Sequence, residues 1–428
     1  MPSRRKGSLF SGAATYLFSN VLNAAIPFAL LPILTRYLTP AEYGEVAMFQ
    51  TFLGALGAFV GLNIVGAAGR KYYDIKDQTA ELQSFIAACL QILLASALLV
   101  FAVVFLFRNQ LSELLALKTE WLLAGVLVSM LLVVINLRLG QWQVRGEARR
   151  YGTLQVSHSL LNLLLSLGLV VVLLQGAAGR IEAQIGAALV FCLIALVSLH
   201  RQQLLRLLVW NPEHLREALR FGVPLIPHVA GAFLVSSVDR IVINAELGLA
   251  DAGIYMVAVQ MAAAMGLVFD ALNKAYVPWL FERLVRDKDE EKRQIVRYTY
   301  AWFGVIVLAV ALAFLIGPYA VRLIAGEQYA AAGEVIGWLA LGQGFSGMYL
   351  MVTNYIFFSK RTGLLSLATI TSGLLNLLLL LVLVRWFGLH GAAIAFSVAM
   401  AVRFLLTWWV AQRRHPMPWF DFHLVTEK

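Results

Sequence analysis

Residues 80–107 read AELQSFIAACLQILLASALLVFAVVFLF, an apolar run with no charged side chain from position 85 onward. Its hydrophobic residues are continuous rather than alternating, which is typical of a helix and not of a membrane β-strand. An α-helix needs about 20 apolar residues to cross about 30 Å of hydrocarbon, so this run is long enough. We therefore predict that it forms a membrane-spanning helix.

Runs of this kind fill almost the whole chain. Hydrophobic residues make up 60% of the 428 positions and charged residues 14%, whereas a soluble protein has about 25% charged residues. We predict an all-α polytopic membrane protein with about twelve transmembrane helices, which leaves little chain for a soluble domain. The predicted spans are 8–35, 44–69, 80–107, 119–141, 151–175, 182–205, 220–246, 252–280, 297–324, 331–358, 362–386 and 390–412.

Lysine and arginine are distributed unequally between the two sides of these spans. Of the 34 basic residues, 25 fall on the side of the N-terminus, six on the other side and three within helices. Because cytoplasmic loops carry the excess of Lys and Arg, we predict that both termini are cytoplasmic, which requires an even number of spans. The net charge of +10 is spread over short loops and does not indicate nucleic-acid binding. The basic segments are 4–6, 70–76, 138–150, 201–220, 283–297, 360–361 and 413–428.

The loops are too short for catalytic chemistry, and none carries a recognisable catalytic motif. Every predicted outer loop has about ten residues, the histidines are scattered, and no Gly-rich phosphate-binding loop is present. We expect no enzyme activity, no cofactor and no metal. Arg4, Arg5 and Lys6 precede an apolar stretch that runs to Leu34, too long for the core of a signal peptide. We expect this stretch to be a retained first helix, and the hydrophilic stretch 281–296 to be a solvated helical connector.

An internal repeat divides the chain near its middle. Three pairs of segments match in order at similar offsets, and six helices per repeat give two halves of the same orientation, related by an axis along the membrane normal. We therefore predict two six-helix lobes, residues 1–210 and 211–428, as in transporters whose bundles rock about a central site. The matching segments are 38–44 with 247–253, 160–165 with 374–379, and 186–188 with 391–393.

Four stretches in this order carry a resemblance to a known family. They are LTRYLTPAEYG at 34–44, SVDRIVINAELGLADAGIY at 237–255, ALNKAYVPWLFERL at 271–284 and GLHGAAIAFS at 388–397. The chain resembles the Wzx-type polysaccharide or O-antigen repeat-unit flippases of the multidrug/oligosaccharidyl-lipid/polysaccharide exporter superfamily. The resemblance implies a twelve-helix, two-lobe protein of the bacterial cytoplasmic membrane. It also implies movement of a polyprenyl-diphosphate-linked oligosaccharide from the inner to the outer leaflet for surface polysaccharide synthesis.

Three basic residues lie within predicted spans, where a charge costs roughly 2.5–3.5 kcal/mol on insertion scales. Arg403 is about 15 Å from the end of its helix at Arg413, too deep to reach the interface easily. We expect it to line a cavity, although a buried ion pair is an alternative. Arg240 follows Asp239, so snorkelling or a local ion pair is as plausible as contact with substrate. Lys274 follows Asp270 by four residues on one helix face, which also fits a structural salt bridge.

Amides reach the same depth and provide the hydrogen-bond partners that sugars need. We predict that the substrate-binding cavity is lined by Arg403, Arg240, Lys274, Asn20, Asn23, Gln50, Asn273 and Asn354. Each amide on its own also fits an ordinary helix–helix contact worth about 1 kcal/mol or less. A basic cavity attracts a diphosphate because low-dielectric walls focus its field. Asp270 and Asp239 are the candidates for binding a coupling proton or cation.

Other membrane proteins share part of this pattern. The nearest alternative is a cation-coupled multidrug exporter of the same superfamily, which usually needs acidic residues where this chain has mainly basic ones. Major-facilitator transporters also have twelve helices in parallel halves, but their Gly- and Arg-rich signature is absent from the stretch GRKYYDIKDQ at 69–78. A polymerase or ligase of the same pathway tends to have a large external loop. We expect a proton or cation gradient and polymerase or chain-length proteins as further partners.

Overall fold

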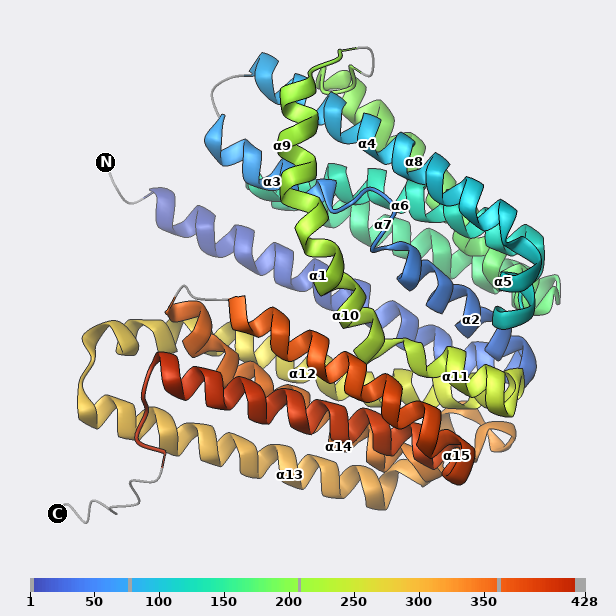
Figure 1. The fold of residues 1–428 in the computed structure, drawn as a ribbon, viewed down its shortest axis with the longest axis vertical. Coiled ribbons are helices and arrows are strands. Elements are labelled where there is room, and N and C mark those ends of the chain that lie inside the picture. The colour runs from blue at the N-terminus through green and yellow to red at the C-terminus, as the bar shows by residue number, and fades with distance from the viewer. Residues whose placement is uncertain (1–3, 76–78, 207–208, 360–362, 420–428) are drawn as a thin grey trace. The chain divides into compact units, whose positions relative to one another are not determined.

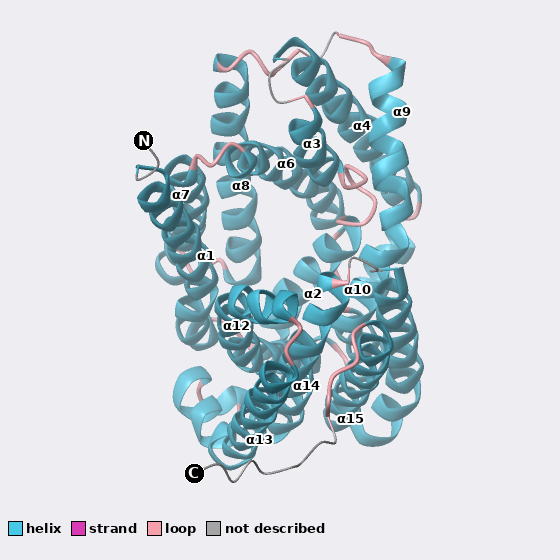
Figure 2. Cartoon of the chain, turned by 90° about the vertical axis from the view of Figure 1, so that its left-hand side faces the viewer, coloured by secondary structure: helices cyan, strands magenta, loops and turns pink. Residues whose placement is uncertain are grey.

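The computed structural model describes residues 4–75, 79–206, 209–359 and 363–419, with side chains from residue 19 onward. These residues form helices and connecting loops, with no strand among them (Figure 2). The predicted cytoplasmic positions of Lys76, Lys360, Arg361 and Lys428 lie outside the described residues. The fold is all-α, as the apolar runs predict.

The chain divides into two compact units, Met1–Phe233 with Leu247–Gly253, and Leu234–Glu246 with Ile254–Lys428. The predicted boundary between two repeats at residue 210 stays a prediction. The helices of the first unit (blue to green in Figure 1) are α1 (Arg4–Tyr37), α2 (Pro40–Leu56), α3 (Ile64–Asp74), α4 (Thr79–Leu106), α5 (Arg108–Leu115), α6 (Thr119–Val144), α7 (Ala148–Ser166), the π-helix η1 (Leu167–Val172), α8 (Gly176–Arg201), α9 (Pro212–Gly222), the 3₁₀ turn η2 (Val223–Leu225) and most of α10 (Ile226–Ser236).

The second unit holds most of the remaining chain. Its helices are α11 (Val238–Leu247), α12 (Leu249–Arg286), α13 (Asp289–Ala325), the 3₁₀ turn η3 (Glu327–Tyr329), α14 (Ala332–Phe358) and α15 (Gly363–Arg414). The predicted connector at 281–296 is a short turn at Asp287, with α12 ending at Arg286 and α13 beginning at Asp289.

Nine helices among the described residues are long and apolar enough to cross a membrane. One of them, α15, contains two predicted spans, because Gly388 has non-helical angles (φ 55°, ψ −135°) that interrupt its 52 residues. The prediction of a multi-pass helical membrane protein is therefore confirmed. Two predicted spans, 44–69 and 220–246, differ from the structure because their helices are broken.

The span predicted at 44–69 is interrupted between α2 and α3. Gly61, Leu62 and Asn63 all have positive φ angles, so the chain leaves the helix and then re-enters it. The freed Gly61 N–H donates a hydrogen bond to Ser96 Oγ on α4 at 2.9 Å. Hydropathy alone does not reveal this break, since the residues on either side of it are apolar.

The span predicted at 220–246 begins earlier and is broken twice. Helix α9 begins at Pro212, where Asn211 Oδ1 accepts hydrogen bonds from the N–H groups of Glu213 (3.0 Å) and His214 (3.3 Å). The basic segment 201–220 is therefore helical from Pro212 onward. The first break is the 3₁₀ turn η2, and the second separates α10 from α11, where Asn376 Nδ2 donates to the carbonyl oxygen of Leu234 at 2.9 Å.

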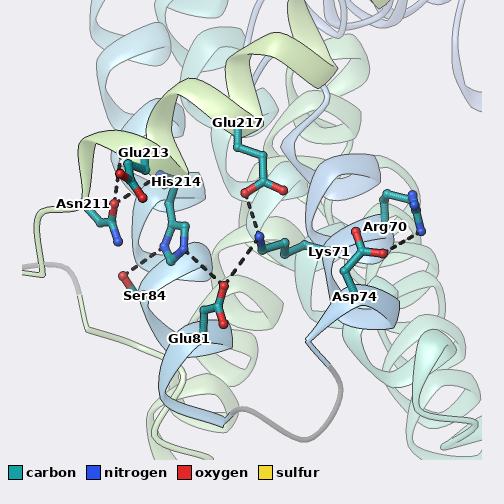
Figure 3. A network of polar contacts seen from close by, with 9 residues as sticks. All are labelled: Arg70, Lys71, Asp74, Glu81, Ser84, Asn211, Glu213, His214 and Glu217. Carbon is teal, nitrogen blue, oxygen red and sulfur yellow. Dashed lines mark hydrogen bonds and ion pairs between the residues drawn. The ribbon is translucent and has the colours of Figure 1, made fainter.

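A polar network fixes α9 against α3 and α4 (Figure 3). Lys71 Nζ lies 2.7 Å from Glu217 Oε2 and 3.7 Å from Glu81 Oε1, and the buried His214 ring contacts Ser84 Oγ at 3.1 Å. Burial lowers the pKa of Lys71, but the hydrogen bond and charge of Glu217 outweigh that effect, so the pKa is raised. Lys71 therefore stays charged and holds Glu217 toward the bundle.

The first pair of repeated segments meets within the first unit. Thr39 caps α2 in a capping box with Glu42, so this part of the motif serves to start a helix. A Cβ on Gly44 would overlap the carbonyl oxygen of Leu249, and one on Gly253 would overlap that of Pro40. The starts of α2 and α12 thus pack backbone against backbone, which requires glycine at the matching motif position in each repeat.

Gly253→Ala is expected to lower stability by about 1–3 kcal/mol or more, because the new methyl group has no space between two backbone segments. The measurement is the thermal transition of the purified protein in detergent. Gly304→Ala in α13 is the matched control, since nothing lies within 4 Å of its Cβ position. If both variants melt like the wild type, the close contact of α2 with α12 is wrong.

Candidate substrate-binding site

Arg403 on α15 lies far from the end of its helix and next to an aromatic ring. It lies ten residues before Arg413 on the same helix, which is about 15 Å along the axis. Its guanidinium carbon stands 4.1 Å from the centre of the Tyr349 ring on α14. In the described part of the chain, Arg403 forms no ion pair, and its side chain is half-buried rather than sealed off. Arg403 therefore has an aromatic ring beside it and, among the described residues, no acidic partner, and its predicted place in a substrate cavity stays a prediction.

The pair Asp270 and Lys274 occupies one face of α12. Lys274 Nζ lies 2.5 Å from Asp270 Oδ2, and the two side chains are 60% and 43% exposed. Lys274 is nine residues, or about 14 Å, from Arg283 near the end of the helix. Charges exposed to lipid at this depth are costly, so we expect this face of α12 to contact water. The salt bridge that the spacing allowed is present.

An amide pair joins α12 to α14 beside an aromatic cavity. The buried Asn354 donates from Nδ2 to Asn273 Oδ1 at 2.8 Å, so these two predicted residues lie together. Asn273 also lines a cavity of about 470 Å³. Its other lining residues include four aromatic side chains that hydropathy analysis read only as parts of spans: Tyr276, Trp279, Tyr298 and Trp302.

The sequence does contain one signal for this aromatic wall, which is the spacing of the four residues. Residues 276 and 279 are three apart and 298 and 302 are four apart, which places each pair on one helix face. The rings of Trp279 and Tyr298 lie 5.6 Å apart across α12 and α13. A cavity with aromatic walls and one amide can take a ligand that has apolar faces and a few hydrogen-bonding groups.

Asp239 and Arg240 form a buried ion pair at the start of α11. Arg240 Nη1 lies 3.1 Å from Asp239 Oδ1 and also bonds to the Ser236 carbonyl oxygen next to the helix break. Both side chains are almost completely buried, and Tyr255 lies against Asp239. Of the alternatives for Arg240, the structure has the local ion pair. A substrate role for Arg240 and an ion-coupling role for Asp239 stay predictions.

The remaining predicted amides belong to the first unit. Asn20 and Asn23 on α1 both contact α7, where Tyr151 Oη donates to Asn20 Oδ1 at 3.5 Å and Ser159 Oγ donates to Asn23 Oδ1. Gln50 is half-buried on α2. These contacts are of the helix–helix kind that was the alternative to substrate binding.

Arg138 is a buried arginine that the sequence placed with the cytoplasmic basic residues. Arg138 lies six residues before the end of helix α6 at Val144, and its side chain is 0% exposed. Its Nε donates to Ser198 Oγ on α8 at 2.9 Å, and its guanidinium carbon lies 4.1 Å from the Trp142 ring centre. Counting charges by side could not find this, because residue number does not reveal which neighbouring helix covers a side chain.

Comparison with known proteins identifies related sequences along most of the chain. The family model described as polysaccharide biosynthesis protein matches residues 9–284. Lsg locus putative protein 1 of Haemophilus influenzae is 25% identical over 375 residues, covering 85% of this chain and 88% of the relative. The succinoglycan biosynthesis transport protein ExoT of Rhizobium meliloti is 24% identical over 330 residues, covering 74% of this chain and 63% of the relative.

Two solved transporter structures share the fold. An inward-facing multidrug resistance MATE family transporter of the MOP superfamily has a TM-score of 0.69 at 17% identity, covering 91% of this chain and 94% of its own. The lipid II flippase MurJ in an inward closed conformation has a TM-score of 0.71 at 14% identity, covering 94% and 87%. These likenesses confirm the predicted fold class of twelve helices in two lobes.

The water exposure of α12 can be tested with thiol chemistry. Cys89 and Cys192 are free and buried, so replacing both by alanine gives a background without thiols. We expect Lys274→Cys to react rapidly with a membrane-impermeant methanethiosulfonate reagent. Leu308→Cys on α13 is 61% exposed and uncharged in the wild type, and we expect it to face lipid and stay unreactive. Equal reactivity of the two positions would contradict a water-contacting face at Lys274.

Proposed function

Since the chain belongs to the polysaccharide biosynthesis protein family, we propose that it is a flippase for a lipid-linked oligosaccharide. Its cargo is a polyprenyl-diphosphate-linked repeat unit, carried from the inner to the outer leaflet of the bacterial cytoplasmic membrane. The product serves synthesis of a surface polysaccharide such as O-antigen, capsule or exopolysaccharide. The transporters that share its fold support a transport role.

The observation that carries this proposal is the unpaired charge of Arg403. A half-buried cation with no acidic partner among the described residues favours an anion, and a guanidinium can bind phosphate oxygens through two parallel hydrogen bonds. The face of Tyr349 supports the guanidinium when no anion is bound, because the ring quadrupole attracts a cation. A diphosphate is the anionic part of the proposed cargo and matches this chemistry.

The aromatic cavity supports binding of the sugars. Trp279 and Trp302 present flat apolar rings, and Asn273 adds an amide next to them. Sugar rings have apolar C–H faces and polar edges, so such a wall suits them better than a uniformly apolar one. Both features lie in the second unit, Arg403 on α15 and the cavity between α12, α13 and α14.

The membrane potential favours the proposed direction. Moving one charge across 100 mV is worth about 2.3 kcal/mol, so two negative charges moving outward gain about 4–5 kcal/mol. A coupled proton or cation would add to this, and Asp270 is the accessible candidate because its side chain is 43% exposed. The basic loops support cytoplasmic termini, which orients the N-terminal side toward the compartment where repeat units are assembled.

The alternative of a cation-coupled multidrug exporter rests on the shared fold with MATE transporters. A binding site for cationic drugs needs a free acidic group. Asp239 and Asp270 are each paired with a basic neighbour at 3.1 Å and 2.5 Å. The charges within the second unit therefore favour an anionic cargo.

Arg403→Ala is expected to reduce transport about 10- to 100-fold, because it removes charge-assisted hydrogen bonds worth roughly 1.5–3 kcal/mol. The measurement is the ratio of surface polymer to cytoplasmic-side lipid-linked repeat unit in a deletion strain carrying the variant. Arg413→Ala is the matched control, since Arg413 also lies over an aromatic ring, that of Trp409 at 3.9 Å, but at the end of the helix. Wild-type transport by Arg403→Ala at equal protein level would remove Arg403 from the site.

The deletion strain without any variant separates the two functions. A flippase predicts loss of the surface polymer together with accumulation of its lipid-linked repeat unit. An intact polymer with increased sensitivity to cationic drugs would support the exporter instead.

A further inference from the structure

A long apolar groove runs along the first unit between α2, α4 and α9. Its volume is about 740 Å³, within the range of ligand-binding sites. On α4 its wall follows one helix face from Gln91 through Ala95 and Leu99 to Val104. Thirteen residues of helix correspond to about 20 Å, roughly two-thirds of the hydrocarbon thickness of a bilayer. The groove therefore has the length of an extended lipid chain within one membrane.

The residues that line the groove are almost all apolar. Ser96 is one of its few polar residues, and its Oγ is already engaged by Gly61 N–H at 2.9 Å and Leu93 O at 3.1 Å. The amide nitrogen of Gln91 donates to Val209 O at 3.0 Å. A sugar or a phosphate would lose its hydration here without gaining partners, so only an apolar chain fits.

Two arginines border the groove at α9. Leu215 and Leu219 line the groove, and Leu219 also belongs to an adjoining depression of about 570 Å³ lined by Arg216 and Arg220. Both arginines are exposed, and in the described part of the chain neither has an ion-pair partner. An apolar channel thus ends beside two free positive charges.

The network in Figure 3 determines which way these side chains point. His214 and Glu217 face α3 and α4, where Ser84 and Lys71 hold them. Positions 215 and 219 lie about 100° round the helix from His214, on the side that lines the groove. Positions 216 and 220 lie a further 100° or so round, away from α3 and α4. The acids on the same helix are Glu213 and Glu217; Glu217 pairs with Lys71, and no ion pair joins either acid to an arginine of the pair in the described part of the chain.

We propose that this groove and the arginine pair form a binding site for the polyprenyl diphosphate carrier, with its hydrocarbon along α4 and its diphosphate at Arg216 and Arg220. The proposal rests on the proposed function, from which it takes the carrier. Two free guanidiniums match the two charges of a diphosphate, whereas a common anionic phospholipid carries one. With cytoplasmic basic loops, the arginines lie at the inner leaflet, where the loaded carrier is made. The site would concentrate cargo on the first unit before transport.

The test uses the full chain in lipid nanodiscs and a geranylgeranyl diphosphate that carries a benzophenone. Photolabelling followed by peptide mapping is expected to place the label on 91–104 of α4. Ala95→Trp should abolish most labelling, because Ala95 is exposed and the indole fills the groove. Arg216→Gln and Arg220→Gln should each weaken labelling about fivefold, the factor expected for a basic residue near an anionic headgroup.

Matched variants separate the site from the general membrane surface. Leu193→Trp adds an indole at an exposed position of α8, and Arg201→Gln removes an exposed arginine at the end of that helix. Both should label like the wild type. If labelling is unchanged in Ala95→Trp, or if the label maps away from α4 and α9, the groove is not the binding site of the hydrocarbon chain. If phosphatidylglycerol competes for labelling as well as unlabelled geranylgeranyl diphosphate does, the site is not specific for a diphosphate carrier.

Binding and transport can fail independently. Photolabelling of the purified protein requires no transport, while the deletion strain tests transport without any assumption about the groove. If the label behaves as expected but the deletion strain keeps its polymer, the carrier site stands and the flippase role fails. If the polymer is lost and the label ignores the groove variants, the carrier site alone is wrong.

Discussion

Hydrogen-bonding groups of the backbone must find partners within the protein wherever water is absent, and this constraint shapes both broken helices of the chain. An unbroken helix satisfies the constraint by itself, but each break frees N–H and C=O groups at membrane depth. Ser96 accepts from Gly61 at the first break, and Asn376 donates to Leu234 at the second. At each of these two positions a polar side chain from a helix distant in sequence bonds a backbone group beside the break.

Because of these breaks, the segment 212–253 belongs partly to one compact unit and partly to the other. Residues 212–233 pack in the first unit, 234–246 in the second, and 247–253 again in the first. The glycine contact of Gly44 with Gly253 fixes the last of these segments, and the Lys71–Glu217 pair fixes the first. Between them lies the buried pair of Asp239 and Arg240, whose guanidinium also bonds the Ser236 carbonyl beside the break. The guanidinium of Arg240 thus provides a hydrogen-bond partner for the backbone at the break between α10 and α11.

The sequence predicted the all-α class and most of the apolar helices, because these depend on composition and on the length of the apolar runs. It placed Arg403 and the pair Asp270–Lys274 at depth for the same reason, since distance along a helix follows from residue number. It did not predict that Arg138 is buried or that Asn376 bonds Leu234, because spacing determines which face a residue occupies and not what lies opposite. The aromatic wall at Trp279 and Trp302 was missed because hydropathy treats such rings as ordinary apolar residues.

Three basic residues within the helices of the second unit differ in whether a carboxylate lies beside them: in the described part of the chain, Arg240 and Lys274 are paired, and Arg403 is not. Arg240 and Lys274 each have a carboxylate within 3.1 Å, so their fields largely cancel at a distance. Among the described residues Arg403 has the Tyr349 ring and no carboxylate beside it, and the ring attracts the cation weakly without neutralising it. A carboxylate in place of that ring would compete with an incoming phosphate, and a second free arginine would bind the phosphate more tightly and slow its release. Under the proposed function, one guanidinium on an aromatic face suits a site that must both bind an anion and release it.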